Sequence, residues 1–272
     1  MGGEARRLEG QVALVTGAGR GLGRAFAERL AAQGAAIGVH GMREDGPAEY
    51  GEGTTLSATA EEIGSAHGVR TCRVLGDLTD STQVAEVVSA VEAALGPIDI
   101  LVHNAGGDIA AAGGKPDPND AVMIEEADVR AVLERNLLST ILICQQVAHG
   151  MMARRRGRIL TISSIAAFRG RADGAIYATA KAGVVHYTRC LADQLRAYDV
   201  AVNSLAPGET RTGRFLATRA VDQERLAEGG TLERIGTVDE VARVVEFFAG
   251  PLGAFVSGQV LRVDGGAQCW PG

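Results

Sequence analysis

The chain has 272 residues, of which 46% are hydrophobic, and a formal net charge of −6 at pH 7. This length and apolar content allow one substantial core, so we expect one α/β domain spanning residues 1–272. Acidic and basic residues are mixed without a basic face that could follow a phosphate backbone, which excludes nucleic acid as an expected partner.

The cysteines are scattered without a C-x-x-C pair, at Cys72, Cys144, Cys190 and Cys269. That spacing argues against a zinc site and against a secreted disulfide framework, so we expect buried or inert thiols and no bound metal. No apolar run approaches the roughly 20 residues of a membrane helix, and residues 1–10 are too polar for a signal peptide. We therefore expect a cytoplasmic protein with no membrane partner.

The first half of the chain alternates short apolar runs with amphipathic stretches, a pattern typical of successive βαβ units. Residues 11–16 predict a buried strand, and residues 22–33 predict a helix that ends at Gly34. The pattern then predicts strands at 35–40, 70–75 and 98–103, a helix that ends with 61–67, and a helix at 81–95.

The second half continues in the same way after a loop rich in Gly, Ala and Pro at 106–120. It predicts helices at 126–154, 177–198 and 238–248, strands at 158–163, 200–205 and 259–263, and a mixed loop and helix region at 207–232. Seven strands that are apolar on both sides favour a parallel sheet with helices on both faces, which is a doubly wound Rossmann-type fold.

A glycine-rich loop lies between the first expected strand and the first expected helix. Its sequence is Thr16-Gly17-Ala18-Gly19-Arg20-Gly21-Leu22-Gly23. Glycines let a backbone turn sharply and approach a ligand, and the N–H groups that begin a helix face an anion such as a pyrophosphate. Turn glycines alone would explain the composition, but the position after the first strand favours a dinucleotide site. The spacing departs from G-x-G-x-x-G because Leu22 stands at the sixth position.

The spacing Thr-Gly-x-x-x-Gly-x-Gly resembles the glycine loop of the short-chain dehydrogenase/reductase family. The resemblance extends along almost the whole chain. Within the family, the chain is similar to the single-domain branch that includes the 3-oxoacyl-ACP reductases. It is carried by Gly76-Asp77-Leu78-Thr79, Asn104-Ala105-Gly106, Asn136, Ser164, Tyr177-x-x-x-Lys181 and Pro207-Gly208-x-x-x-Thr212. His103 departs from the pattern, since the family often has a second Asn there.

This resemblance implies an NAD(P)(H)-dependent oxidoreductase that interconverts a ketone or aldehyde and an alcohol. It implies that Asp77 and Leu78 border the adenine, that 104–106 form the floor of the cofactor site, and that Thr212 contacts the nicotinamide carboxamide. The full set of expected cofactor contacts is Gly17, Gly19, Arg20, Gly21, Leu22, Gly23, Arg43, Asp77, Leu78, Asn104, Ala105, Gly106, Tyr177, Lys181, Pro207, Gly208 and Thr212.

Tyr177 and Lys181 are four residues apart, so on a helix they lie on one face. An unperturbed tyrosine has a pKa of about 10, whereas a general acid or base works best near the ambient pH. We therefore expect the Lys181 ammonium, together with an oxidised nicotinamide ring, to lower the pKa of Tyr177. By itself the pair also fits an amphipathic helix with a solvated lysine, and it is the surrounding motifs that favour catalysis.

Ser164 follows the strand at 158–163, and the carboxyl ends of such strands are where doubly wound folds bind ligands. Neighbouring residues of a strand point to opposite sides, so only one of Ser163 and Ser164 faces the site, and we choose Ser164 to orient the substrate oxygen. Asn136 has no propensity advantage inside a helix. By resemblance it holds a water that links Lys181 to solvent, while the alternative is a polar residue on the helix surface.

The end of the second strand bears on the choice of nicotinamide. NAD enzymes commonly place an acidic residue there for the ribose 2′-OH, whereas a 2′-phosphate needs a cation. Here Gly41 stands where the acid is expected, with Arg43 two residues later and Arg20 in the glycine loop. We therefore favour NADP(H) over NAD(H), although Glu44 and Asp45 follow directly.

Two segments are expected to form substrate walls, the long loop at 107–120 and the region at 209–230 where the family carries a mobile lid. Arg211, Arg214 and Arg219 of the lid could hold an anionic substrate, but a solvated surface explains them better. We therefore infer no carboxylate or thioester substrate from them. A polar, glycine-rich insertion at 44–59 is interpreted as ordinary loop variation.

Other functions share these motifs. An NAD-dependent alcohol dehydrogenase that works oxidatively would carry the same residues, and a catalytically idle dinucleotide-binding regulatory protein would keep the fold. The presence of Asn136, Ser164, Tyr177 and Lys181 argues against the idle protein. The resemblance also implies a homotetramer or homodimer that packs through the helices at 126–154 and 177–198. The substrate is expected to be a small carbonyl compound or alcohol.

Overall fold

Seven parallel strands form one sheet in this structure, a computed structural model that describes residues 6–226 and 229–269. The strand order is β3-β2-β1-β4-β5-β6-β7, and each neighbouring pair is parallel. The predicted doubly wound parallel sheet is therefore confirmed. The strands are β1 (Val12–Thr16), β2 (Ala36–Gly41), β3 (Thr71–Leu75), β4 (Ile100–His103), β5 (Gly157–Ile162), β6 (Val200–Pro207) and β7 (Val260–Val263).

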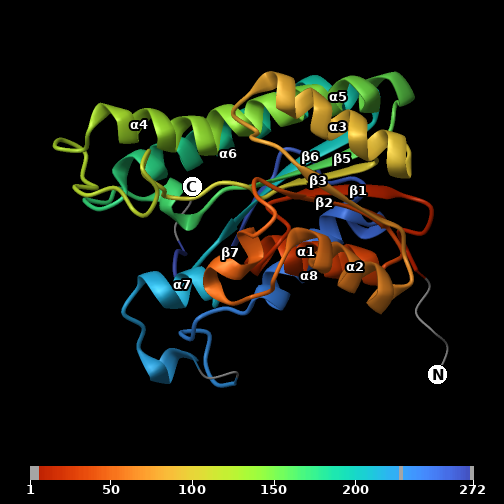
Figure 1. Cartoon of the computed structure of the whole chain (residues 1–272). Helices are drawn as coiled ribbons and strands as arrows, with labels where there is room; N and C mark the ends of the chain where they lie inside the picture. Colours follow the sequence, from red (N-terminus) through yellow and green to blue (C-terminus); the bar gives the residue numbers. More distant parts are fainter. Residues whose placement is uncertain (1–5, 227–228, 270–272) are drawn as a thin grey trace.

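Helices cover both faces of the sheet, as Figure 1 shows. Alternate strand residues build the two cores: Ala13 and Val15 pack with the helices of one face, while Val12 and Leu14 pack with those of the other. One face carries α1 (Gly21–Ala32), α2 (Leu56–His67) and α8 (Val238–Ala249), and the other carries α3 (Ser81–Leu95), α5 (Ser139–Arg154) and α6 (Ala175–Leu195).

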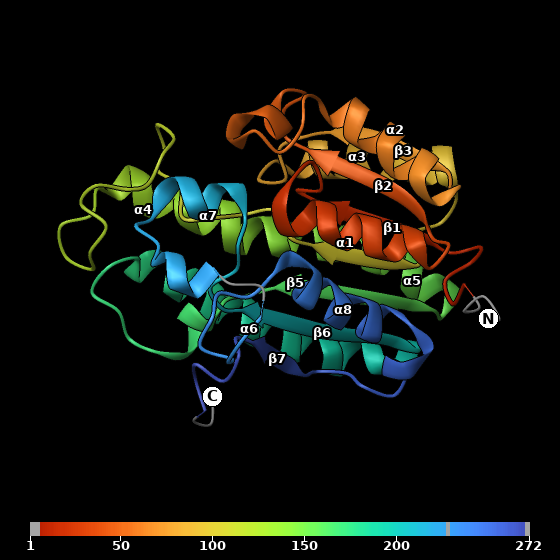
Figure 2. The same ribbon diagram turned by 90° about the horizontal axis from the view of Figure 1, so that it is seen from below.

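The carboxyl ends of the strands meet at one edge of the sheet, because all seven run in the same direction. Figure 2 shows α4 (Glu126–Leu133) and α7 (Gly213–Thr218) beyond this edge. The glycine loop, the segments after β3, β4, β5 and β6, and the start of α6 all lie near this edge, so the fold gathers residues from the whole chain at one place.

Two helices differ in detail from the sequence pattern. The helix expected to end at 61–67 begins at Leu56, where the hydroxyl of Thr55 caps it by accepting a hydrogen bond from the Ala58 amide. The helix expected at 126–154 contains a π-helical turn at Glu134–Leu138, between α4 and α5. Such a turn adds one residue locally, which a search for a 3.6-residue period does not detect.

The four thiols are free, as expected, but they are not all buried. Cys144 is fully buried, which raises its pKa to about 12. Cys72 is partly buried, whereas Cys190 and Cys269 are exposed. Of the expected alternatives, buried or inert thiols, burial does not apply to the last two, because the sequence does not reveal which side of a helix or loop faces the core.

No helix within residues 6–226 and 229–269 is long and apolar enough to cross a membrane. In that same part of the chain, no three side chains of His, Cys, Asp or Glu gather closely enough to hold a metal ion. Residues 1–5, which contribute to the polar start of the sequence, lie outside the described residues.

Candidate functional site

The glycine loop turns sharply between β1 and α1 and presents backbone N–H groups at the start of the helix. Gly17 and Gly21 have φ angles of 62° and 53°, a region that favours glycine. A Cβ at Gly23 would overlap the carbonyl oxygen of Gly17. The amide of Gly21 donates to the carboxylate of Glu52, so the loop holds an anion here. These residues therefore fit the pyrophosphate of a dinucleotide.

Thr16 ties the glycine loop to the segment that follows β4. Its hydroxyl oxygen accepts hydrogen bonds from the amides of Asn104 and Ala105, each at 3.0 Å. The hydroxyl proton is then donated to Nδ1 of His103, 3.0 Å away. The side chain of Asn104 also donates to the carbonyl of Gly17. The expected floor of the cofactor site, residues 104–106, thus lies directly beside the glycine loop.

His40 supports the glycine loop from the end of β2. Its Nδ1 accepts from the amide of Gly17 at 3.3 Å, and its Nε2 donates to the carbonyl of Gly76 at 3.1 Å. This arrangement uses the neutral imidazole, and burial lowers the pKa of His40 to about 4. Sequence reasoning missed this residue, although a histidine in an otherwise apolar strand was a signal for it.

Asp77 and Leu78 lie after β3, next to the end of β2, because the Gly76 amide donates to the carbonyl of Gly41. The Asp77 carboxylate accepts hydrogen bonds from the amide and the hydroxyl of Thr79, at 2.9 and 2.8 Å. Leu78 is buried. The structure thus places both residues on the side of the glycine loop nearest β2, and their contact with the adenine stays a prediction.

Ser164 and Tyr177 meet at the carboxyl end of β5. Ser164 follows the strand and caps a 3₁₀ turn by accepting from the amide of Ala166 at 3.1 Å, while its side chain lies near enough to Tyr177 of α6 to lower the pKa of that phenol. Ser163 points the other way, because its hydroxyl donates to the backbone carbonyl of Lys181 at 2.9 Å. The structure therefore brings Ser164, and not Ser163, to the tyrosine.

The electrostatic surroundings raise the pKa of Tyr177. Burial is the largest cause, the hydrogen bond with Ser164 opposes it, the charge of Asp108 adds to it, and Arg214 and Arg219 oppose it. From the sequence we expected Lys181 to lower the pKa of Tyr177. The residues around Tyr177 shift its pKa in the opposite direction. The reason is that the energy of removing a phenolate from water exceeds the stabilisation from the nearby cations.

Lys181 lies one helical turn after Tyr177, with its Nζ 5.7 Å from the centre of the tyrosine ring. The side chain is 4% exposed, and Nζ donates to the carbonyl of Ile162 at 2.9 Å. Burial lowers the pKa of Lys181 to about 8. The ammonium therefore lies between the end of β5 and the tyrosine. Its lowered pKa lets it lose its proton at a pH only slightly above neutral.

Asn136 occupies the centre of the π-helical turn and is fully buried. Its Oδ1 accepts from the amide of Gly107 at 2.9 Å, and its Nδ2 donates to the Gly107 carbonyl at 2.8 Å. A Cβ at Gly106 would lie 3.5 Å from Nζ of Lys181. The alternative of a helix-surface residue is thus wrong, because the π turn directs this side chain inward against the segment after β4.

Thr212 begins α7 and caps it by accepting from the Phe215 amide at 3.2 Å. Its methyl group lies close to the glycine loop, since a Cβ at Gly21 would be 3.4 Å away from it. Pro207 ends β6, and the amide of Gly208 donates to the Val263 carbonyl at 2.9 Å. These connections bring the segment 207–212 to the same edge as the glycine loop.

Arg20 and Arg43 come together through a residue that sequence reasoning missed. The carboxylate of Glu49 lies 3.0 Å from each guanidinium. Arg20 also donates to the carbonyl of Gly46 and stacks on the ring of Tyr50. The two arginines expected to favour NADP(H) over NAD(H) are therefore neighbours, and both pair with the carboxylate of Glu49. No local sequence signal marks Glu49, because the insertion at 44–59 has no periodic pattern.

The lid and the loop at 107–120 touch beside Tyr177. Arg214 donates to the backbone carbonyl of Asp108 at 2.9 Å, so it is not the solvated residue that we expected. Arg211 donates to the carbonyl of Leu226, and Arg219 stacks on the ring of Phe215. Residues 227 and 228 of the expected lid lie outside the described residues.

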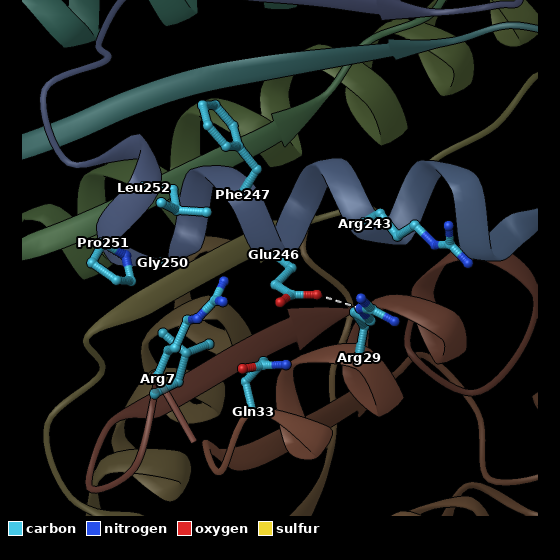
Figure 3. A pocket seen from close by; sticks show the side chains of 10 residues that line it. Arg7, Arg29, Gln33, Arg243, Glu246, Phe247, Gly250, Pro251 and Leu252 are labelled. Carbon is cyan, nitrogen blue, oxygen red and sulfur yellow. Dashed lines mark hydrogen bonds and ion pairs between the residues drawn. The ribbon is translucent and has the colours of Figure 1, made fainter. Parts of the chain in front are cut away.

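A pocket of about 220 Å³ lies elsewhere, between α1 and α8 (Figure 3). Arg29 and Glu246 form an ion pair across it, and Arg7 and Leu252 line its rim. None of the residues that line it belongs to the group around Tyr177. We therefore assign the functional site to the sheet edge and not to this pocket.

Comparisons with known proteins agree with the arrangement at the sheet edge. The family model of the short chain dehydrogenases matches residues 11–222. The chain is 38% identical to a cyclohexanol dehydrogenase of Rhodococcus sp. (strain TK6), over 95% of this chain and 96% of the relative. It is 33% identical to a 3-oxoacyl-[acyl-carrier-protein] reductase of Escherichia coli (strain K12), over 95% and 98%.

Among solved structures, the chain is similar to a 7α-hydroxysteroid dehydrogenase complexed with NADH and 7-oxo glycochenodeoxycholic acid. The TM-score is 0.83 and the sequence identity 29%, with 98% of this chain and 97% of that chain covered. The family model, the relatives and the parallel sheet with its glycine loop agree. The chain belongs to the short-chain dehydrogenase/reductase family of NAD(P)(H)-dependent oxidoreductases.

Proposed function

We propose that this enzyme interconverts a ketone or aldehyde and an alcohol, with Tyr177 as the general acid and base. The observation that carries the proposal is the convergence of Ser164, Tyr177 and Lys181, with Nζ of Lys181 5.7 Å from the centre of the tyrosine ring. The pair lies at the sheet edge that also holds the glycine loop, which brings a carbonyl and a dinucleotide within reach of each other.

The residues divide the chemistry as follows. The dinucleotide supplies or accepts the hydride when it is bound. Ser164 donates a hydrogen bond to the substrate oxygen, and Tyr177 transfers a proton to or from that oxygen. Lys181 stabilises the phenolate electrostatically, and Asn136 holds the segment at Gly107 and a water that connects Lys181 to solvent. Buried groups positioned in advance in this way need little rearrangement in the transition state.

The substrate is best identified with a panel, because relatives of this chain are named for different substrates. We would assay cyclohexanol, cyclohexanone, a 3-oxoacyl thioester and a 7-oxo bile acid by the absorbance of NADH and NADPH. Turnover of any of these compounds supports the proposal. A protein that binds either dinucleotide but turns over no alcohol or carbonyl compound would instead be the idle regulatory protein.

NADP(H) is the favoured cofactor, since Gly41 leaves no acid at the end of β2 and Arg20 and Arg43 lie side by side. A 2′-phosphate would replace Glu49 between the two guanidinium groups. The alternative, an NAD-dependent alcohol dehydrogenase that works oxidatively, keeps Glu49 in place.

Arg43→Ala is expected to raise the KM for NADPH about tenfold and to leave the KM for NADH nearly unchanged, because one charge-assisted contact with the phosphate is lost. Steady-state kinetics with both cofactors measure this. Arg243→Ala, at an exposed position of α8, is the control. A wild-type enzyme with a higher kcat/KM for NADH than for NADPH would contradict the cofactor choice and leave the catalytic proposal intact.

Asp108 is expected to tune the pH dependence of catalysis, since its charge raises the pKa of Tyr177. Asp108→Asn removes that charge and therefore lowers the pKa of Tyr177. In the oxidative direction the deprotonated tyrosine acts as the base, so the rise of kcat/KM with pH moves to lower pH. Asp108→Glu keeps the charge and should keep the wild-type profile, and identical profiles for all three proteins would refute the role of Asp108.

We further propose one domain over residues 1–272, with a substrate lid at 209–230, in a cytoplasmic homotetramer or homodimer. The helices at 126–154 and 177–198 are the expected contact, and the exposed Leu138 between α4 and α5 supports a packed surface there. Light scattering coupled to size exclusion measures the assembly, and a monomeric mass at micromolar concentration would contradict it.

A further inference from the structure

The insertion after β2 contacts the glycine loop and has a defined path. We call residues 44–55 the strap. Glu44 holds its two ends together, because its backbone carbonyl accepts from the Leu56 amide and its carboxylate accepts from the Ser57 amide, at 2.8 and 2.9 Å. Arg24 of α1 donates to the carbonyl of Glu52 at 3.3 Å. Figure 2 shows this segment beside α7. The strap also reaches the start of α1, because Glu52 accepts a hydrogen bond from the amide of Gly21.

The carboxylate of Glu52 bridges the starts of two helices. One oxygen accepts from the amide of Gly21 in the glycine loop, and the other accepts from the amide of Gly213 in α7. A Cβ at Gly213 would overlap the Glu52 carboxylate, so the contact depends on glycine there. The strap thus joins the glycine loop to the lid through a single anionic group.

Glu49 makes a comparable contact, because its carboxylate lies 3.0 Å from each of two cations. Its carboxylate pairs with Arg20 and Arg43, the residues proposed to bind a 2′-phosphate. Helix N–H groups and guanidinium groups bind carboxylates and phosphates through the same hydrogen bonds. The two carboxylates of the strap therefore take the partners that the phosphates of a dinucleotide require, and the interpretation of this segment as ordinary loop variation does not explain its contacts.

We propose that the strap is an intramolecular competitor of the dinucleotide, with Glu52 in the position of the pyrophosphate. Binding of the dinucleotide then requires Glu52 to leave the amides of Gly21 and Gly213, which also frees α7 from the strap. Because the Glu52 contacts must break first, they lower the affinity for the dinucleotide. Movement of the lid is coupled to cofactor binding for the same reason. This inference rests on the proposed function, because it places the pyrophosphate at the glycine loop.

The first test measures dinucleotide binding without turnover. Glu52→Gln keeps the shape of the side chain and removes its charge, so the Kd of NADPH and NADH, measured by nicotinamide fluorescence, should fall about tenfold because the competing charge-assisted hydrogen bonds are weakened. Glu61→Gln removes the same charge from an exposed position on α2 and should leave the Kd unchanged. An unchanged or higher Kd for Glu52→Gln overturns the proposal.

The second test uses the wild-type protein, so it does not depend on the folding of a variant. Hydrogen exchange of backbone amides should become faster in residues 46–53 when NADPH is added, while residues 17–23 become protected. Slower exchange in both segments overturns the proposal, because the strap would then stay in place. A wild-type protein that binds neither dinucleotide contradicts the proposed function itself, whereas normal binding with no effect of Glu52→Gln contradicts only the role of the strap.

Discussion

Replacement of Tyr177 by phenylalanine should lower kcat by about a thousandfold, the range that general acid and base catalysis contributes. The ring remains, so it still packs against Nζ of Lys181, which lies 5.7 Å from its centre. Only the hydroxyl group, which lies near Ser164, is lost. The Kd of the dinucleotide should therefore stay within about twofold of wild type. Steady-state rates and a fluorescence titration of the same preparation measure the two quantities.

Tyr187→Phe is the matched control, because Tyr187 lies on the same helix and its hydroxyl makes only a long hydrogen bond of 3.5 Å, to the carbonyl of Ile141. This variant should keep the wild-type rate. If Tyr177→Phe also keeps a rate near wild type, Tyr177 is not the proton donor and acceptor.

Acid should destabilise the fold through two buried histidines. Burial lowers the pKa of His103 to about 3, with the charges of Lys181 and His40 as further causes, and burial lowers the pKa of His40 to about 4. A depressed pKa in the folded state means that the unfolded chain binds protons first as the pH falls. The stabilising contribution of the neutral histidines is therefore complete above about pH 6.5 and is lost progressively as the pH falls from there to 4 for His40 and to 3 for His103.

His103→Asn tests this linkage, because asparagine accepts a hydrogen bond from Thr16 without titrating. Between pH 6.5 and 4 the free energy of unfolding of the wild type should fall by about 3 kcal/mol more than that of the variant. Urea titrations across this pH range measure it. His186→Asn, at an exposed position of α6, should keep the wild-type slope. Equal slopes for His103→Asn and wild type would contradict the burial of a neutral His103.

The order of elements followed from local patterns, and the structure confirms all seven predicted strands. Each strand is a short apolar run bounded by turn residues, so its signal lies within a few neighbouring positions. The π-helical turn around Asn136 did not follow, because one extra residue barely changes the apolar period over a long helix. The inward position of Asn136, which brings it against Gly107, depends on that turn.

The members of the proposed catalytic group could be brought together from the sequence because they keep fixed spacings. Tyr177 and Lys181 share a helix face by their separation alone, strand alternation allows only one of Ser163 and Ser164 to face the site, and the family resemblance selected Ser164. The sign of the pKa shift of Tyr177 could not be predicted, since it depends on burial and on Asp108 and Arg214, which act on the tyrosine from the loop after β4 and from α7.

By itself, the sequence determined the sheet, the glycine loop and the candidates for the reacting groups, because each is encoded in neighbouring residues or in short, regular spacings. Only the tertiary structure decided what surrounds them. Glu52 and Gly213 are 161 residues apart, and His40 and Gly17 are 23 apart. Contacts over such separations depend on the path of the folded backbone, so the role of the strap and the support of the glycine loop became visible only when the strands and helices were placed in space.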